Sequence, residues 1–303
     1  MGAQLRAVRR RIRSVQSTAK ITRAQELIAS SRIIRAQQRV RDARAYDREI
    51  TRAVTAVVSR SGQVDHPLTR PVPNPERAAV LILTSDRGFA GGYNATVLRE
   101  AQRLEELLRE RHVTPAPFVS GRKGITWHSF RDLDVEAHWS GFSETPAHDN
   151  AAEITKVLLD AFAAPDSEGG VDEIYLVHNE FVSMLTQRPA ISRLLPLEIE
   201  ETTEESAGGP VPIYEFEPSA VEVLDALLPW YIESRIFHAL LDAAAAEIAA
   251  RRRAMKSATD NANDLVDSLT LEANKARQAE ITQEISEIVG GANALTDTTA
   301  GSR

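Results

Sequence analysis

Two long stretches with helical spacing enclose a middle region with a different pattern. Residues 3–61 and 230–289 contain no glycine and no proline, and both are rich in alanine, arginine, glutamate, glutamine, leucine and isoleucine. These residues favour helices, and one helix of about 60 residues would reach about 90 Å. A compact domain is only about 30 Å across, so helices of this length must protrude or pair with each other.

Apolar residues in both stretches recur in alternating steps of three and four. In the second stretch this spacing persists for more than four heptads, which favours a coiled coil. The alternative is two helices of a large bundle, but no other helical segment is long enough to complete one. The first stretch contributes Leu5, Val8, Ile12, Val15 and Ala19, then Ile21, Ala24 and Ile28 in a shifted phase. The second contributes Phe237, Leu241, Ala244, Ile248, Arg251, Met255, Ala258, Ala262, Leu265 and Leu269, and after a slip Ile281, Ile285, Ile288, Ala292 and Leu295.

Short apolar runs alternate with helical patterns in residues 76–215. The run AAVLILT at 78–84 is typical of a buried parallel strand, and residues 93–111 follow it with helical periodicity. This alternation predicts an α/β domain with a mostly parallel, Rossmann-like sheet. Further strands are expected at 118–120, 135–139, 173–177 (extended by Phe181 and Val182) and 191–197, a helix at 151–163, and polar loops at 166–170 and 198–212.

Charge is distributed unevenly along the chain, whose formal net charge is −7. Residues 1–60 carry 15 basic and four acidic side chains, a net of +11, and the remainder carries −18. A nucleic-acid-binding arm is one interpretation of this basic stretch. However, the arm holds only one aromatic residue, Tyr46, and its apolar seam commits one face to a partner. We therefore favour pairing with the C-terminal helix, where residues 220–291 hold 12 acids and seven bases.

Composition excludes several classes of protein and site. The chain has no cysteine, which removes disulfides, thiolate zinc sites and a cysteine nucleophile. No apolar run approaches the length of about 18 residues that a membrane span needs. The first 25 residues lack acids, as a mitochondrial transit peptide does, but the same pattern continues past residue 52 without a cleavage-like region. We expect a location in the cytosol or at a cytosolic membrane face.

The glycine-rich segment 85–94 (SDRGFAGGYN) is the main candidate for a phosphate-binding loop. It lies between a predicted strand and a predicted helix, as dinucleotide-binding loops do. The spacing of Gly88, Gly91 and Gly92 is GxxGG, which matches neither GxGxxG nor the P-loop pattern. A structural turn is therefore the favoured interpretation. We expect Asp86 and Arg87 to pair with each other or to cap the helix that follows.

No other constellation assembles a catalytic or metal site. The seven histidines form no HExxH or other ligand spacing, and no GxSxG elbow is present. We therefore expect no catalytic residue, no cofactor and no metal site, and a protein that is not an enzyme. A nucleotide-binding enzyme built on the central domain is the alternative.

Four segments of the chain resemble the gamma subunit family of bacterial F-type ATP synthases, in the order in which that family carries them. The last of them matches the family signature ITxExxExxxGA at Ile281, Thr282, Glu284, Glu287, Gly291 and Ala292. The matching segments are 12–35 (IRSVQSTAKITRAQELIASSRIIR), 84–94 (TSDRGFAGGYN), 254–261 (AMKSATDN) and 274–294 (NKARQAEITQEISEIVGGANA).

The resemblance implies a central rotor stalk without catalytic activity of its own. In that family the terminal helices form an antiparallel coiled coil that enters a hexamer of alpha and beta subunits. The α/β domain lies near the epsilon subunit and the membrane ring of c subunits, and the delta, a and b subunits belong to the same complex. Proton flow drives rotation, which couples to ATP synthesis at the beta subunits. The resemblance implies no nucleic-acid partner, and attachment to the cytoplasmic side of the plasma membrane only through the complex.

The resemblance also implies partner contacts for six residues. Arg251, Gln278, Thr282 and Glu284 match positions that contact a catch loop of the beta subunit, and Lys20 and Arg23 match basic positions facing the head. Arg251 occupies a seam position in an otherwise apolar heptad, where an arginine needs a carboxylate partner or an outward path to solvent. Gln25 departs from the family, which often has methionine there. The resulting division is an N-terminal coiled-coil helix at 1–61, a globular α/β domain at 62–217, and a C-terminal coiled-coil helix and tip at 218–303.

Overall fold

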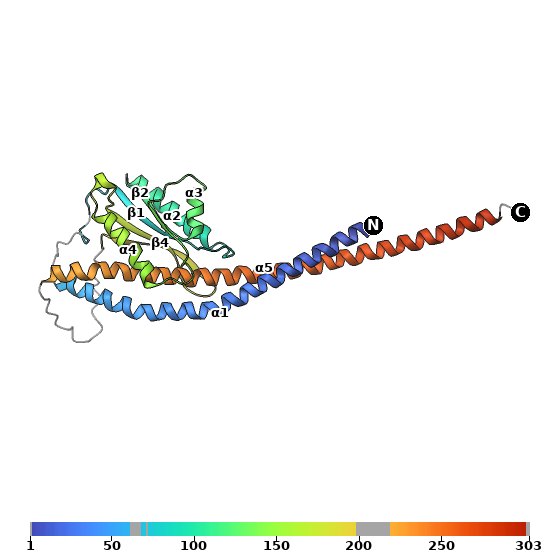
Figure 1. Cartoon of the computed structure of the whole chain (residues 1–303), viewed down its shortest axis with the longest axis horizontal. Coiled ribbons are helices and arrows are strands. Elements are labelled where there is room, and N and C mark those ends of the chain that lie inside the picture. Colours follow the sequence, from blue (N-terminus) through green and yellow to red (C-terminus); the bar gives the residue numbers. More distant parts are fainter. Residues whose placement is uncertain (1, 61–67, 71, 198–218, 301–303) are drawn as a thin grey trace. The chain divides into compact units, whose positions relative to one another are not determined.

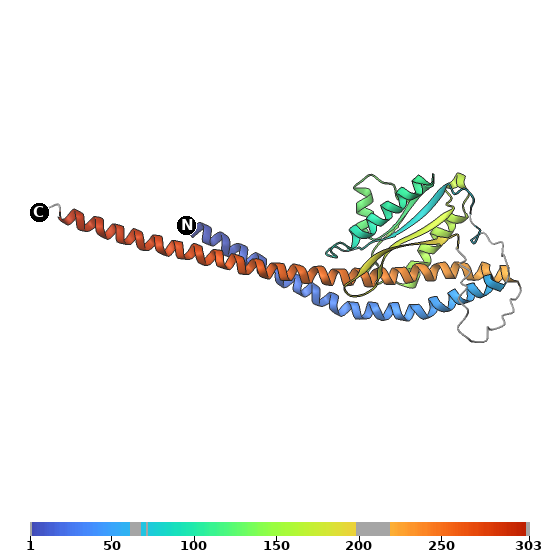
Figure 2. The same ribbon diagram turned by 180° about the vertical axis from the view of Figure 1, so that it is seen from behind.

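The computed structural model describes residues 2–60, 68–70, 72–197 and 219–300. The loop predicted at 198–212 lies outside these residues. Along the chain, one long helix precedes and another follows a domain of five strands and three shorter helices, as the sequence pattern predicts, and beside this domain both helices run along the same side of it (Figures 1 and 2). The elements are α1 (Gly2–Arg60), β1 (Arg77–Leu83), α2 (Tyr93–Glu110), β2 (Thr114–Ser120), α3 (Arg122–Ser129), β3 (Ala137–Trp139), α4 (His148–Ala163), η1 (Asp166–Glu168), β4 (Glu173–Phe181), β5 (Gln187–Leu195) and α5 (Ala220–Ala300).

The chain forms two compact units, whose boundaries differ from the three consecutive parts predicted along the sequence. The smaller unit combines Met1–Ile28 with Ala254–Arg303, and the larger unit is Ala29–Arg253. Each long helix contributes to both units. The division at residues 61/62 and 217/218 describes the order of parts along the chain and stays a prediction.

The sheet of the larger unit has the strand order β3-β2-β1-β4-β5. The first four strands are parallel and β5 is antiparallel to β4, which confirms the prediction of a mostly parallel α/β sheet. β1 is central and its side chains alternate between two cores. Ala78, Val80 and Ile82 pack toward α2, whereas Ala79, Leu81 and Leu83 pack toward α4 and α5.

Strand β2 begins four residues before its predicted start, and helix α3 was not predicted at all. Pro115 and Pro117 lie in β2, where prolines are tolerated because the short β3 pairs only with residues 118–120. α3 has eight residues and contains Gly124, so its helical signal is weak. A side chain at Gly124 would place its Cβ 2.7 Å from Val119 Cγ1, which explains why glycine is used inside this helix.

In the smaller unit, α1 and α5 pair through a seam that includes polar residues. Leu5 and Val8 pack against Leu269 and Ala273. Farther along α1, the Thr22 hydroxyl forms a 2.7 Å hydrogen bond with the Thr259 hydroxyl, and both threonines are buried. One hydroxyl donates to the other, and the accepting threonine can donate to a carbonyl of its own helix, Ala19 O or Met255 O. These polar side chains therefore occupy the seam without the cost of an unpaired buried group.

The predicted shift of phase in the N-terminal seam is wrong. Ile21 and Ile28 are 61% and 45% exposed, whereas Thr22 and Glu26 are buried. The original steps of three and four therefore continue from Ala19 through these two polar positions. On α5 the buried residue is likewise Thr259, one position after the predicted Ala258. Hydrophobicity alone selects the wrong residues here because the threonine pair replaces an apolar contact.

In the larger unit, α5 is enclosed on all sides over residues 239–251. Every residue in this stretch is buried. One side packs against α1 through Ala29 and Ile33, a second joins the sheet core through Ala239 and Ala243, and a third meets the turn after β1. The small alanines of this stretch let all three neighbours approach the helix closely. We call residues 239–251 the enclosed stretch.

Candidate functional site

Arg251 of α5 is a densely connected polar side chain of the larger unit. It is only 7% exposed. Its Nη2 donates to Glu247 Oε1 at 2.6 Å, and its Nη1 donates to Glu144 Oε1 at 2.8 Å. Its Nε and Nη2 also donate to the carbonyl oxygens of Gly88 and Arg87, at 3.2 and 3.3 Å. The guanidinium therefore joins α5 to two separate loops. Glu247 and Glu144 are the carboxylate partners that an arginine at an apolar seam position needs when it has no outward path to solvent.

Glu247, one helical turn before Arg251, is fully buried. Burial raises the pKa of its carboxyl to about 7, although the neighbouring Arg251 favours the charged form. Within the described part of the chain its Oε2 atom has no hydrogen-bond partner. Burial, together with the nearby Glu247, raises the pKa of the Tyr93 hydroxyl well above its ordinary value, and this hydroxyl donates to Ala243 O at 3.1 Å. The charge of Glu247 thus depends on Arg251.

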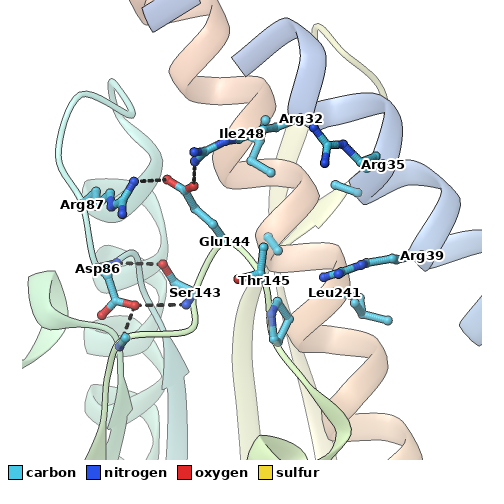
Figure 3. Close-up of a pocket in the computed structure, with 14 residues that line it drawn as sticks. Arg32, Arg35, Arg39, Asp86, Arg87, Ser143, Glu144, Thr145, Leu241 and Ile248 are labelled. Atoms are coloured by element: carbon cyan, nitrogen blue, oxygen red, sulfur yellow. Dashed lines mark hydrogen bonds and ion pairs between the residues drawn. The ribbon is translucent and has the colours of Figure 1, made fainter. Parts of the chain in front are cut away.

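Glu144 lies in the loop before α4 and pairs with arginines from three elements. Besides Arg251, it pairs with Arg32 of α1 and lies 3.9 Å from Arg87 Nη1 in the turn after β1 (Figure 3). One carboxylate therefore gathers charge from α1, α5 and the sheet domain. A partly buried carboxylate shared in this way stabilises one arrangement of these elements, because removing any partner leaves charge less well compensated.

Asp86 positions the loop that carries Glu144. Its carboxylate accepts hydrogen bonds from the backbone amides of Arg122, Gly141 and Ser143, at 3.2, 2.8 and 3.0 Å. Burial by itself would raise the pKa of Asp86, but these hydrogen bonds lower it below its ordinary value. The expectation that Asp86 pairs with Arg87 or caps the following helix is wrong. Its carboxylate instead reaches the start of α3 and a loop more than 50 residues away along the chain.

The glycine-rich turn after β1 has a packing role, in line with the favoured interpretation. One of its three glycines, Gly91, has a positive φ of 58°. Phe89 in the same turn also has a positive φ, of 64°. The turn brings the Gly88 carbonyl to Arg251 and places Ala90 and Tyr93 against Ala246 and Ala250 of α5.

The other five residues expected to contact partners lie in the smaller unit. Lys20, Gln278, Thr282 and Glu284 are exposed, and Arg23 is exposed while pairing with Glu26 at 2.8 Å. On α5 the Thr282 hydroxyl donates to the Gln278 carbonyl one turn earlier, so these two residues are neighbours. Arg251 lies in the other unit, and its guanidinium is engaged within the chain.

Glu144, Glu247 and Tyr93 belong to the site but are not among the residues that the sequence pattern predicts. Glu247 had a usable signal, because it is the single acid in an alanine-rich run and lies four residues before Arg251, a spacing that places both on one helix face. Glu144 and Tyr93 are 107 and 158 residues from Arg251 and reach its surroundings only through the fold.

Comparison with known proteins places the chain in a family. A family model described as ATP synthase matches residues 4–295. The ATP synthase gamma chain of Acidothermus cellulolyticus is 60% identical over 298 residues, covering 98% of this chain and 99% of its own length. That of Thermobifida fusca is 55% identical over 305 residues, with both chains fully covered. The chain belongs to the family of ATP synthase gamma chains.

Chains from two solved ATP synthase structures share the fold of this gamma-chain family member. A chain from the Euglena gracilis mitochondrial ATP synthase, in a structure of OSCP, F1 and c-ring, matches with a TM-score of 0.68 at 16% identity. That match covers 97% of this chain and 95% of the other. A chain from the rotor of the same organism's enzyme gives a TM-score of 0.66 at 18% identity, with 93% and 100% covered. The resemblance seen in the sequence and the predicted fold class are both confirmed.

Neither a cluster of metal-binding side chains nor a membrane-spanning helix occurs among the described residues of this gamma-chain family member. No group of three or more histidine, aspartate or glutamate side chains there could hold a metal ion. No helix among the described residues has an apolar stretch long enough to cross a bilayer.

Two ionisable groups with shifted pKa values are expected to give this gamma-chain family member opposite pH dependences of stability. The pKa of Glu247 is raised from 4.5 to about 7, so its contribution to stability is present below pH 4.5 and is lost as the pH rises through 7. Burial lowers the pKa of His178 from 6.5 to about 4, so its contribution is present above pH 6.5 and is lost as the pH falls through 4. Chemical denaturation across pH 4.5–7.5 measures both effects.

The variants Glu247→Gln and His178→Gln test these two effects, and each serves as the control for the other. Glu247→Gln is expected to make the free energy of unfolding rise more steeply with pH than in the wild type, because the opposing contribution is removed. His178→Gln is expected to make it rise less steeply or fall. The same slope in wild type and both variants would contradict the assignment of these pKa values.

Proposed function

We propose that the chain is the noncatalytic rotor subunit of the central stalk of an ATP synthase. Its rotation couples proton flow through the membrane sector to ATP synthesis at the beta subunits of the catalytic head. Membership of the gamma-chain family over almost the whole chain carries this proposal. The matching solved chains come from structures described as a rotor and as a central stalk with c-ring, which supports the same role.

The partners proposed are the alpha and beta subunits around the coiled coil, and the epsilon subunit and the c-ring near the sheet domain. The delta, a and b subunits belong to the same assembly. Attachment to the cytoplasmic side of the plasma membrane runs through these partners. No nucleic acid and no cofactor of its own enter this role.

Exposed apolar residues on α5 support insertion into a surrounding partner. In the smaller unit the seam with α1 ends near Ala276, since its last members pack against Leu5 and Val8 at the start of α1. Beyond it, Ile281, Ile285 and Ile288 keep steps of four and three and are all exposed. A face of this kind needs cover from another protein in the working state.

Reconstitution tests the proposed role. The chain alone is expected to show no ATPase activity. Mixing it with alpha and beta subunits should give a stable complex with cooperative turnover, and adding it to membranes depleted of the gamma chain should restore ATP synthesis driven by a proton gradient. Failure to co-purify with alpha and beta subunits, or restored membranes without synthesis, would refute the role.

Contact with the beta subunit is proposed for the exposed residues Gln278, Thr282 and Glu284, and for Lys20 and Arg23 on α1. The triple variant with alanine at the first three positions is expected to lower the rate of ATP synthesis about tenfold, because three polar contacts are lost. ATP synthesis in reconstituted membranes measures this. Gln283→Ala, on the same exposed part of α5, is the control and should leave the rate unchanged. For Arg251 we propose a positioning role instead, because its donors are engaged within the chain.

A further inference from the structure

A cavity of about 440 Å³ lies in the larger unit between α1, α5 and the loop before α4. Arg32, Arg35 and Arg39 line it from one face of α1, since positions three and four apart lie above one another on a helix. Figure 3 shows these side chains reaching toward α5 and the loop that carries Ser143 and Thr145. Its volume falls within the range of small-molecule sites, about 300–1,000 Å³.

The charges that line the cavity do not balance. Asp86 and Glu144 are its acids, and Arg87 adds a fourth arginine. The carboxylate of Asp86 is occupied by backbone amides, and Glu144 pairs with Arg32 and Arg251. Among the described residues, Arg35 and Arg39 have no carboxylate within ion-pair distance. Two guanidinium groups therefore face the cavity without a counter-charge from the described part of the chain.

The wall opposite these arginines is apolar and carries no aromatic ring. It consists of Leu241, Ala244 and Ile248 of α5, together with Pro146. A low-polarity wall strengthens the attraction between the guanidinium groups and an anion, because less water screens the charges. The lining offers no ring on which a nucleobase could stack, so recognition would rest on the anionic groups of the ligand.

We propose that this cavity binds a polyphosphate group, with Arg35 and Arg39 as its principal donors. Guanidinium groups match phosphate oxygens with paired, charge-assisted hydrogen bonds. Linked phosphates place several anionic oxygens in one short chain, which suits arginines that converge on a single hollow. A peptide carboxylate carries one charge on a separate flexible stem and would suit basic residues spread along a groove. This site is independent of the proposed rotor function.

Titration calorimetry of the full-length chain with tripolyphosphate at low salt tests the proposal. We expect saturable binding of one ligand per chain, about tenfold or more weaker in the double variant Arg35→Gln, Arg39→Gln. The control Arg41→Gln, Arg48→Gln removes the same charge from exposed positions of α1 outside the lining and should bind as the wild type does. Equal affinity for ATP and tripolyphosphate would support an inorganic polyphosphate ligand, whereas tighter binding of ATP would support a nucleotide.

A second measurement uses the wild-type chain and so does not depend on a variant folding. Phenylglyoxal modifies accessible arginines, and tripolyphosphate is expected to protect Arg35 and Arg39 but not Arg48, as read by mass spectrometry. Binding that never saturates, equal weakening in both double variants, or protection of Arg48 to the same degree would overturn the proposal. Tighter binding of a glutamate-rich peptide than of tripolyphosphate would also overturn it, in favour of an acidic protein segment.

Discussion

Replacing Arg251 with methionine is expected to lower the free energy of unfolding by about 3–5 kcal/mol at pH 8. The substitution keeps much of the side-chain volume but leaves Glu247 as a buried charge without its counter-ion, and removes one partner from Glu144. It also leaves the carbonyl groups of Arg87 and Gly88 without this donor. Urea denaturation followed by circular dichroism measures the loss.

The double variant Arg251→Met, Glu247→Gln separates charge from packing. If the loss arises from the uncompensated carboxylate, the double variant should be more stable than Arg251→Met alone at pH 8. The loss in the single variant should also shrink at pH 5.5, where Glu247, with a pKa of about 7, is mainly neutral. An equal loss at both pH values would contradict the proposed dependence of Glu247 on Arg251.

Gly121→Ala is expected to cost about 3 kcal/mol or more. Gly121 has a φ of +101°, and a Cβ there would lie 2.2 Å from the backbone oxygen of Thr84. The Thr84 carbonyl belongs to the chain just after the central strand, so it cannot move without disturbing the sheet. Thermal unfolding of the full-length variant measures the loss.

Gly141→Ala is the matched control for that substitution. Its φ of +103° is almost the same, but a Cβ there meets nothing within 4 Å. This variant carries backbone strain without a clash, and should cost about 1–2 kcal/mol. Similar losses in both variants would show that strain, and not contact with Thr84, determines the effect.

The sequence predicts the architecture well where one physical signal dominates. The absence of glycine and proline marks α1 and residues 230–289 of α5, although α5 also continues through Pro229 and Gly290. The apolar run at 78–83 marks the central strand because it is buried on both faces. The signal fails where tertiary contacts decide. Helix α3 is short, contains glycine and depends on Asp86 for a partner at its first amide, which only the folded sheet supplies.

The residues of the candidate site likewise include one that the sequence pattern predicts and others that depend on tertiary contacts. Arg251 stands out in the sequence because a charge interrupts an apolar seam, and that position predicts either a carboxylate partner or an outward path to solvent. The identity of Glu144 as one of the partners cannot be predicted, since it lies in a loop placed by Asp86 through long-range hydrogen bonds. Likewise, Thr22 occupies a seam position because its hydroxyl forms a hydrogen bond with Thr259, and the local sequence pattern does not predict this position.

The enclosed stretch of α5 has a consequence for how the family can diverge. With α1, the sheet core and the turn after β1 against its three sides, a larger residue at Ala245 can be accepted only if a facing residue, such as Ala29 or Ile33, becomes smaller. Insertion of one residue would turn every following side chain by about 100° into the wrong neighbour. Homologous chains should therefore change this stretch by compensating pairs of substitutions and never by insertion or deletion.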